Sequence, residues 1–131
     1  MISYKIAISA LILITGRKFM IKQIDWSSWL KDDYIAIALV SLNLEVIYRK
    51  CGIEFKEKFD DFDYFKFALF EISLEDSGKL EYIMLKRYKN YPDEGTGVYM
   101  NKIIYSKNIF LEHFLEITKL SKYITWRAEL A

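Results

Sequence analysis

The clearest pattern of apolar residues lies in the middle of the chain. Residues 65–74 are rich in aromatic and β-branched side chains, which predicts a strand, and residues 80–88 predict a second strand after the turn-forming segment 75–78. The residue that ends this segment, Gly78, tolerates the positive φ that a tight turn requires. The pattern therefore predicts an antiparallel hairpin, and residues 98–105 predict a further strand.

The N-terminal half has a less regular pattern of apolar and polar residues, and the assignment of residues 34–40 stays open. Residues 20–26 predict a short strand, and residues 44–48 predict another, which Gly52 ends. Between them, residues 28–42 carry apolar side chains at helical spacing after serines that can cap a helix, which predicts a helix. Residues 34–40 are apolar throughout, however, so a buried strand is the alternative for that run.

The C-terminal part completes the predicted fold. Residues 108–120 predict a second helix that Asn108 caps, and one face of this helix carries Phe110, Phe114 and Ile117. A short tail at 123–127 then gives the element order β-α-β-β-β-β-α-β. Because consecutive strands in the middle favour antiparallel pairing, the sequence predicts an α+β fold. We expect an antiparallel sheet of four to five strands with two helices packed on it.

Residues 1–19 permit three interpretations. The apolar run 6–14 follows Lys5 as in a signal peptide, although it is shorter than the roughly 20 residues that span a membrane. Alternatively, residues 16–19 would be encoded in an AT-rich bacterial gene by a purine-rich stretch that resembles a ribosome-binding site, and translation would begin at Met20. The third interpretation is a buried first strand or helix of the fold.

The length of 131 residues suits one domain. The expected organisation is an upstream extension or signal-like segment at 1–19, followed by a single α+β domain at 20–131. Removing the first segment takes away Lys5, Arg17 and Lys18, so the net charge falls from +1 to −2. With 19 basic and 18 acidic residues, the chain does not have the charge excess of proteins that bind nucleic acid by general phosphate neutralisation.

The single cysteine and the single histidine limit the chemistry of the chain. Cys51 permits no intramolecular disulfide, and together with His113 it is too few for a zinc site built of Cys and His. Histidine is a common general base, but His113 lies at the edge of an apolar helical face without a motif that supplies a nucleophile. The neighbouring Arg49 and Lys50 would lower the pKa of the Cys51 thiol, although a structural thiol is the simpler interpretation. The sequence thus leaves catalysis open and favours a role without it.

An acidic and aromatic segment is the most suggestive feature. Residues 54–63 contain five carboxylates, two lysines and three phenylalanines, and their local charge is −3. Aromatic anchors among charges of one sign suit a basic protein partner, because charge speeds the encounter and rings supply buried area. The alternative is a solvated segment with its phenylalanines in the core. The predicted partner-binding residues are Glu54, Phe55, Glu57, Asp60, Asp61, Phe62 and Asp63.

Three other features have a functional and a structural interpretation. The basic stretch 86–89 has a charge of +3 and a ring for stacking on RNA or single-stranded DNA, but lysines at the exposed end of a strand also discourage edge pairing. The glycine-containing loop 90–97 lacks the spacing of a phosphate-binding loop, and Asp93 and Glu94 would repel an anion. The three tryptophans Trp26, Trp29 and Trp126 are predicted to pack together, and the alternative is an exposed aromatic recognition surface.

The leading hypothesis is a protein-binding module, either an inhibitor such as a toxin-neutralising immunity protein or an adaptor. Its expected partner is a basic protein that contacts residues 54–63. One alternative is a small-ligand-binding domain or small enzyme with a pocket between sheet and helix, and the other is a nucleic-acid binder through residues 86–89. We expect no cofactor, no metal and no membrane span, and a cytoplasmic location, because a chain without disulfides suits a reducing compartment.

Overall fold

The computed structural model describes residues 10–14, 17–25, 34–59, 64–74, 78–89, 95–101 and 107–129. The predicted α+β fold with an antiparallel sheet is confirmed, but the sheet is larger than the expected four to five strands. Within the described residues the strands are β1 (Ala10–Ile14), β2 (Arg17–Ile24), β3 (Tyr34–Val40), β4 (Lys56–Phe59), β5 (Tyr64–Leu74), β6 (Lys79–Tyr88), β7 (Thr96–Asn101) and β8 (Ile124–Arg127). The helices are α1 (Leu44–Cys51), α2 (Lys107–Thr118) and the short 3₁₀ helix η2 (Ser121–Tyr123).

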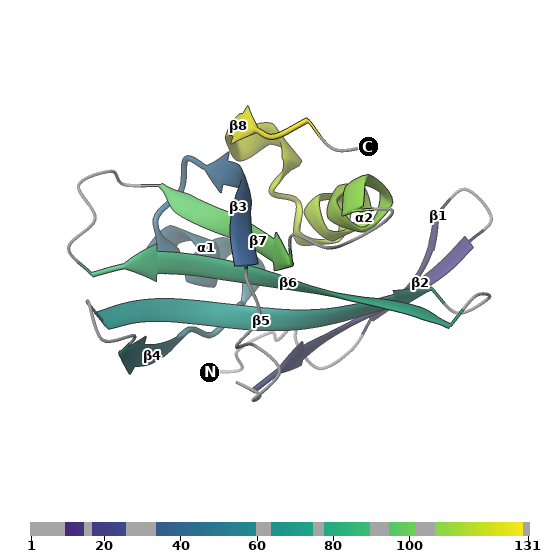
Figure 1. Ribbon diagram of the computed structural model, residues 1–131, viewed down its shortest axis with the longest axis horizontal. Helices are drawn as coiled ribbons and strands as arrows, with labels where there is room; N and C mark the ends of the chain where they lie inside the picture. Colours follow the sequence, from purple (N-terminus) through teal and green to yellow (C-terminus); the bar gives the residue numbers. More distant parts are fainter. Residues whose placement is uncertain are drawn as a thin grey trace.

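The strands form one antiparallel sheet in the order β1-β2-β5-β6-β7-β3-β8. Strand β4 pairs with the part of β5 that does not pair with β2. The long hairpin of β5 and β6 runs along the molecule, with β4 at one of its ends and β1 and β2 at the other (Figure 1). As predicted, this hairpin turns at Gly78, whose φ is 66°. Three of the other described strands pair with it directly: β2 and β4 with β5, and β7 with β6.

Two strands share one edge of β5. β2 pairs with residues 69–74 of β5, and β4 pairs with residues 64–67. Where the two strands meet, the Gln23 side chain donates a hydrogen bond to the Glu54 carbonyl (2.8 Å), and Lys56 forms an ion pair with Asp25. The strand β4 was not predicted, because its four residues are all exposed and three of them are charged. Such charges are typical of an edge strand.

The two faces of the sheet bury different clusters of side chains. Alternate residues of a strand point to opposite faces, so the even-numbered residues of β5 from 68 to 74 join a core with α1 and α2. The odd-numbered residues from 65 to 69 join a second cluster, to which no described helix contributes. We call these the helix face and the aromatic face.

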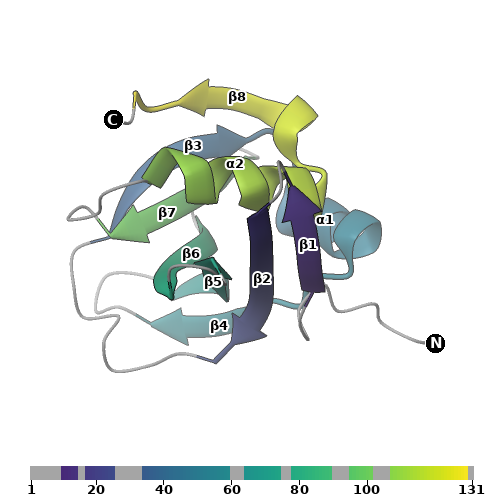
Figure 2. The ribbon, with the colours of Figure 1, turned by 90° about the vertical axis from the view of Figure 1, so that its right-hand side faces the viewer.

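The helix face holds the main core. In α2, the Phe110 ring lies 5.9 Å from that of Phe19, and the Phe114 ring lies 5.1 Å from that of Phe70. All four rings are buried. Both views place α2 between β7 and the β1–β2 pair, over the curve of the sheet (Figure 2). The predicted second helix is thus confirmed, although it begins at Lys107 and not at Asn108.

Two local predictions in the N-terminal half are corrected. Residues 34–40 form strand β3 and no helix, because this apolar run lies inside the sheet between β7 and β8. Residues 44–51 form helix α1 and no strand. The Asn43 side chain accepts a hydrogen bond from the Val46 amide, and the helix ends at Gly52, whose φ of 71° permits the left-handed cap. These caps outweigh the apparent alternation of Leu44, Val46 and Tyr48.

Other predictions agree with the structure over part of their length. The strand at 20–26 corresponds to β2, which begins earlier, and the tail at 123–127 contains β8. The strand expected at 98–105 corresponds to β7, and residues 102–106 lie outside the described residues. Because β7 begins at Thr96, Gly97 belongs to a strand and not to the expected loop.

The first 19 residues contain β1 and the beginning of β2. β1 pairs with β2 from Ala10 opposite Ile21 to Ile14 opposite Arg17. Phe19 is fully buried in the main core. The start at Met20 stays a prediction, and the structure shows its consequence: a chain that begins there lacks β1 and the Phe19 ring. The mass of the protein made in its own host decides between the two starts.

Candidate functional site

One row of side chains crosses the aromatic face. Residues directly opposite on antiparallel strands point to the same face, so the register between strands defines the row. Trp126 lies opposite Leu39, Leu39 opposite Gly97, Gly97 opposite Lys86, and Lys86 opposite Phe67. The row therefore joins β8, β3, β7, β6 and β5, which are far apart in the sequence.

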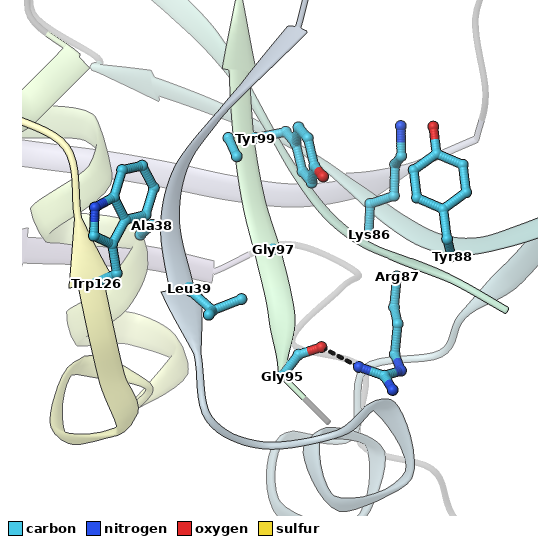
Figure 3. A pocket seen from close by; sticks show the side chains of 10 residues that line it. Ala38, Leu39, Lys86, Arg87, Tyr88, Gly95, Gly97, Tyr99 and Trp126 are labelled. Atoms are coloured by element: carbon cyan, nitrogen blue, oxygen red, sulfur yellow. Dashed lines mark hydrogen bonds between the residues drawn. The ribbon is translucent and has the colours of Figure 1, made fainter. Parts of the chain in front are cut away.

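Gly97 creates a depression in the middle of this row. A Cβ atom at Gly97 would lie 2.6 Å from Cε1 of Tyr99, so only glycine leaves room for the Tyr99 ring at this place. The depression has a volume of about 210 Å³, with Trp126 on one side and Tyr99, Lys86 and Tyr88 on the other (Figure 3). We call it the aromatic hollow, defined by Leu39, Lys86, Arg87, Tyr88, Gly97, Tyr99 and Trp126.

The ammonium group of Lys86 lies among aromatic rings. Its Nζ atom is 4.8 Å from the ring centre of Phe65, 4.5 Å from that of Tyr88 and 4.9 Å from that of Tyr99. A cation is attracted to the electron-rich face of a ring at such distances. The contacts keep a positive charge at the border of the hollow, where a ligand would meet it.

A second cation lies at the other border. The Arg87 guanidinium donates a hydrogen bond to the Gly95 carbonyl, which holds it beside the beginning of β7 (Figure 3). Trp126 belongs to the edge strand β8 and is 49% exposed. The hollow thus combines a half-exposed indole, two tyrosines and two cations, a set that can stack on a flat ring and attract an anion.

The predicted partner-binding segment is only partly within the described residues. Phe55 packs on the main core, so it serves the fold, and the Glu54 carbonyl accepts the bond from Gln23. Glu57 is exposed on β4 opposite Lys66. Asp60, Asp61, Phe62 and Asp63 lie outside the described residues, in the connection between β4 and β5. The structure therefore brings Glu57 and this connection to one end of a hairpin and separates Phe55 from it.

An exposed pair of rings flanks that connection. Phe59 and Tyr64 are the last paired residues before it, and their ring centres are 4.9 Å apart. The exposed fractions are 51% for Phe59 and 49% for Tyr64. The Nζ atom of Lys89 lies 5.8 Å from the Tyr64 ring centre. We call Glu57, Phe59, residues 60–63 and Tyr64 the hairpin end.

A second depression borders the hairpin end. It has a volume of about 420 Å³ and lies between the beginning of α1 and the ends of β4, β5 and β6. Its charged lining residues have both signs, since Glu45 and Glu57 face it together with Lys66, Arg87 and Lys89. The surroundings of the hairpin end are therefore mixed in charge, and the excess of carboxylates is confined to residues 60–63.

The two residues considered for catalysis lie against the main core. The His113 ring is 7% exposed, lies 3.8 Å from the Phe19 ring centre to centre, and has Nδ1 3.0 Å from the Ile109 carbonyl oxygen. The Cys51 thiol packs on the core and donates a hydrogen bond to the Thr118 carbonyl (3.3 Å). Burial raises the pKa of this thiol and outweighs the opposing effect of Lys50, so the interpretation of Cys51 as a thiol of lowered pKa is wrong.

The sequence did not show that the residues of the hollow belong together. Lys86 and Trp126 were each considered for recognition, but Tyr99 was not, and only the strand register brings these residues together. Gly97 was a further signal, because a glycine inside a strand often marks a close approach of another group. The predicted packing of the tryptophans stays a prediction, since Trp26 and Trp29 lie outside the described residues.

Three further findings bear on function. Within the part of the chain that the structure describes, no three His, Cys, Asp or Glu side chains lie close enough together to hold a metal ion. The described helices include none that is long and apolar enough to cross a membrane. Comparison of the chain with models of protein families, with curated proteins and with solved structures finds no match.

Proposed function

We propose that the chain is a protein-binding module whose contact surface is the hairpin end. The observation that carries this proposal is the ring pair of Phe59 and Tyr64, which contact each other at an interplanar angle of 45° while about half of each side chain is exposed. Large rings contribute most to binding when a partner covers them. Two of them side by side at an exposed hairpin end form an anchor of this kind.

The charge of the hairpin end favours a basic partner surface. The connection 60–63 carries three aspartates and no basic residue. Complementary charge speeds association, and rings that become buried slow dissociation. Because Lys66 and Lys89 lie close by, the favoured partner has a small basic site and not a broad basic surface. The neighbouring depression has room for a side chain of that partner.

Inhibition is the form of protein binding that we favour. A small domain that covers the active site of another protein needs rigid anchors and a charged rim, and no catalytic group of its own. A toxin-neutralising immunity protein is one example, and an adaptor uses the same kind of contact. The identity of the bound protein distinguishes these roles.

The first test is to identify and measure a partner. The full chain, tagged at its C-terminus, is expressed in its own host, and the proteins that co-purify at physiological salt are identified. One stoichiometric partner with a basic surface is expected. The affinity of the purified pair is then measured as a function of salt, and the absence of any stoichiometric partner would contradict the proposal.

Matched variants test the surface itself. Replacing Asp60 and Asp61 by lysine is expected to slow association about tenfold or more at low salt. The control replaces Glu116 and Glu129 by lysine, which changes the net charge equally at exposed positions on α2 and beyond β8. If both double variants slow association equally, only net charge matters and the hairpin end is not the contact surface.

The ring pair is tested separately. Phe59→Ser removes an exposed anchor and is expected to speed dissociation about tenfold or more. Leu80→Ser is the control, because Leu80 is similarly exposed but lies at the other end of the β5–β6 hairpin. Thermal unfolding of each variant verifies the fold. Equal dissociation rates for both variants would assign the anchor to another surface.

A further inference from the structure

We infer that the aromatic hollow binds a flat heteroaromatic ring that carries a phosphate, the chemistry of a nucleotide unit. The inference is independent of the proposed protein-binding function, because it concerns Lys86, Tyr99 and Trp126 on the sheet face and not the hairpin end. Two sources supply this chemistry, a free nucleotide and a single-stranded nucleic acid. The test below distinguishes them.

The size of the hollow suits a single ring. Pockets that enclose a drug-sized molecule have volumes of roughly 300–1,000 Å³. The hollow has about 210 Å³ and opens on the sheet surface between Trp126 and Tyr99. It therefore has room for one base, while the sugar and the phosphate remain outside.

The rings around the hollow supply stacking surfaces from separate strands. Trp126 comes from β8, Tyr99 from β7 and Tyr88 from β6, and Gly97 leaves the space between them (Figure 3). Stacking on aromatic side chains tolerates any base, because every base has a π-face. A half-exposed indole beside such a space is a surface on which a base can stack.

The cations of the hollow favour a phosphate over a neutral group. Among its described lining residues, Lys86 and Arg87 are charged and no carboxylate is present. The rings of Phe65, Tyr88 and Tyr99 surround the Lys86 ammonium, so its position is defined before a ligand arrives. Asp93 and Glu94 precede Gly95 in the sequence and lie outside the described residues. Because these two carboxylates would oppose a phosphate if they lay near the hollow, the test compares the same ligand with and without its phosphate.

Fluorescence anisotropy of short labelled oligonucleotides tests the inference on the full chain. Oligouridylate and oligothymidylate are titrated at low salt, and uridine and uridine monophosphate are used as competitors. Binding of the oligonucleotides is expected, with an affinity that falls as salt rises. Uridine monophosphate is expected to compete at least tenfold better than uridine, because the nucleoside lacks the phosphate.

Variants connect this binding to the hollow. Trp126→Ala removes one stacking surface and is expected to weaken binding about tenfold. Lys86→Met keeps an unbranched side chain and removes the charge, which is expected to lower the salt slope by about one. Gly97→Ala pushes the Tyr99 ring out of its place and is expected to weaken binding without changing the net charge.

Two controls have the same chemistry at other places. Tyr48→Ala removes a partly exposed ring from α1, and Lys22→Met removes an exposed lysine from β2. Neither is expected to change the affinity by more than about twofold. Thermal unfolding verifies that each variant folds. If Lys86→Met does not fold, Trp126→Ala still tests whether binding depends on the hollow.

The outcomes separate the possibilities. Tight oligonucleotide binding that only the hollow variants weaken supports a single-stranded nucleic acid as the source of the ligand. Equal affinity for uridine monophosphate and the oligonucleotides supports a free nucleotide. The inference is overturned if uridine binds as well as its monophosphate, if the control variants weaken binding equally, or if neither oligonucleotides nor uridine monophosphate bind.

Discussion

The two faces of the central sheet are made by the same strands but use different side chains. On the helix face, Phe70 and Ile72 of β5 are fully buried among aliphatic and phenylalanine side chains that α1 and α2 complete. On the aromatic face, Phe65 and Phe67 lie beside tyrosines that remain partly exposed. The apolar residues of one strand therefore differ in environment: those on the helix face are enclosed in the main core, and those on the aromatic face lie beside partly exposed rings.

The comparison shows how one sheet can separate stability from recognition. A fully covered face stabilises the fold in proportion to its buried apolar area. A face with half-exposed tyrosines, a tryptophan and a lysine loses part of that stabilisation but keeps groups that can contact a ligand. Because side chains alternate along a strand, substitutions on one face can be made without touching the other.

The largest expected effect comes from the helix face. Phe70→Ala removes a fully buried ring that contacts Phe114 of α2. We expect the free energy of unfolding to fall by about 3–5 kcal/mol, because the loss of transfer energy is joined by an internal cavity. Urea unfolding followed by circular dichroism measures this loss. A fall of less than about 1 kcal/mol would mean that α2 does not depend on this contact.

A matched substitution on the aromatic face should cost less. Phe67 is three residues away on the same strand and is 4% exposed, so the removed area is similar. We expect Phe67→Ala to lower the free energy of unfolding by about 2–3 kcal/mol, because partly exposed neighbours such as Tyr82 and Tyr99 can move into the space. Equal losses for the two variants in the same assay would show that both faces are equally rigid cores.

The thiol on the helix face gives a smaller effect that depends on pH. Burial raises the pKa of Cys51 above its ordinary value of 9.0, so the native state favours the protonated thiol. This contribution to stability is complete below the unfolded pKa and is lost as pH rises through the folded pKa. We expect the stability advantage over Cys51→Ala to decrease at alkaline pH, measured by urea unfolding at several pH values. An advantage that grows with pH would contradict the burial of the thiol.

The same thiol should also react slowly. At mildly alkaline pH, we expect iodoacetamide to modify Cys51 about tenfold more slowly in the native protein than in urea, because the thiolate is the reacting species. Mass spectrometry follows this reaction without ambiguity, since the chain contains one cysteine. Equal rates in the two states would show that the Thr118 carbonyl and the surrounding core do not protect the thiol.

Among the three ring substitutions, the smallest expected effect on stability comes from the exposed part of the aromatic face. Trp126→Ala should lower the free energy of unfolding by about 1–2 kcal/mol, less than the loss of a fully buried ring, because half of the indole is already exposed. The same variant is expected to show the largest loss of nucleotide binding. If it unfolds the protein instead, Trp126 belongs to the core and the two faces are more alike than their exposure indicates.

The predictable parts of the fold are those whose signals are local. The β5–β6 hairpin follows from the aromatic and β-branched residues before a turn that ends at Gly78 and the apolar residues after it, and α2 follows from its apolar spacing. The error at 44–51 arose because alternation and helical spacing coincide over so few residues. Asn43 and Gly52 were the better signals, since both caps are visible in the sequence. The charged strand β4 carried no hydrophobic pattern at all.

In the candidate sites, too, the features with a local signal were predictable and those that depend on strand register were not. The carboxylates of residues 54–63 and the basic residues 86–89 were identified from the sequence, because charge and residue type need no partner strand to be recognised. The ring pair of Phe59 and Tyr64, in contrast, depends on the register of β4 with β5. Phe55 was assigned to a surface and lies against the core, because a segment of mixed character does not reveal which of its rings is covered.

The sequence by itself determined the fold class, the central hairpin and the second helix. Composition and local periodicity are properties of neighbouring residues, so the chain expresses them before it folds. Only the tertiary structure decided that Trp126, Gly97 and Lys86 stand in one row. Their juxtaposition depends on the register of four strands, and register is settled when one face of the sheet is buried against the helices.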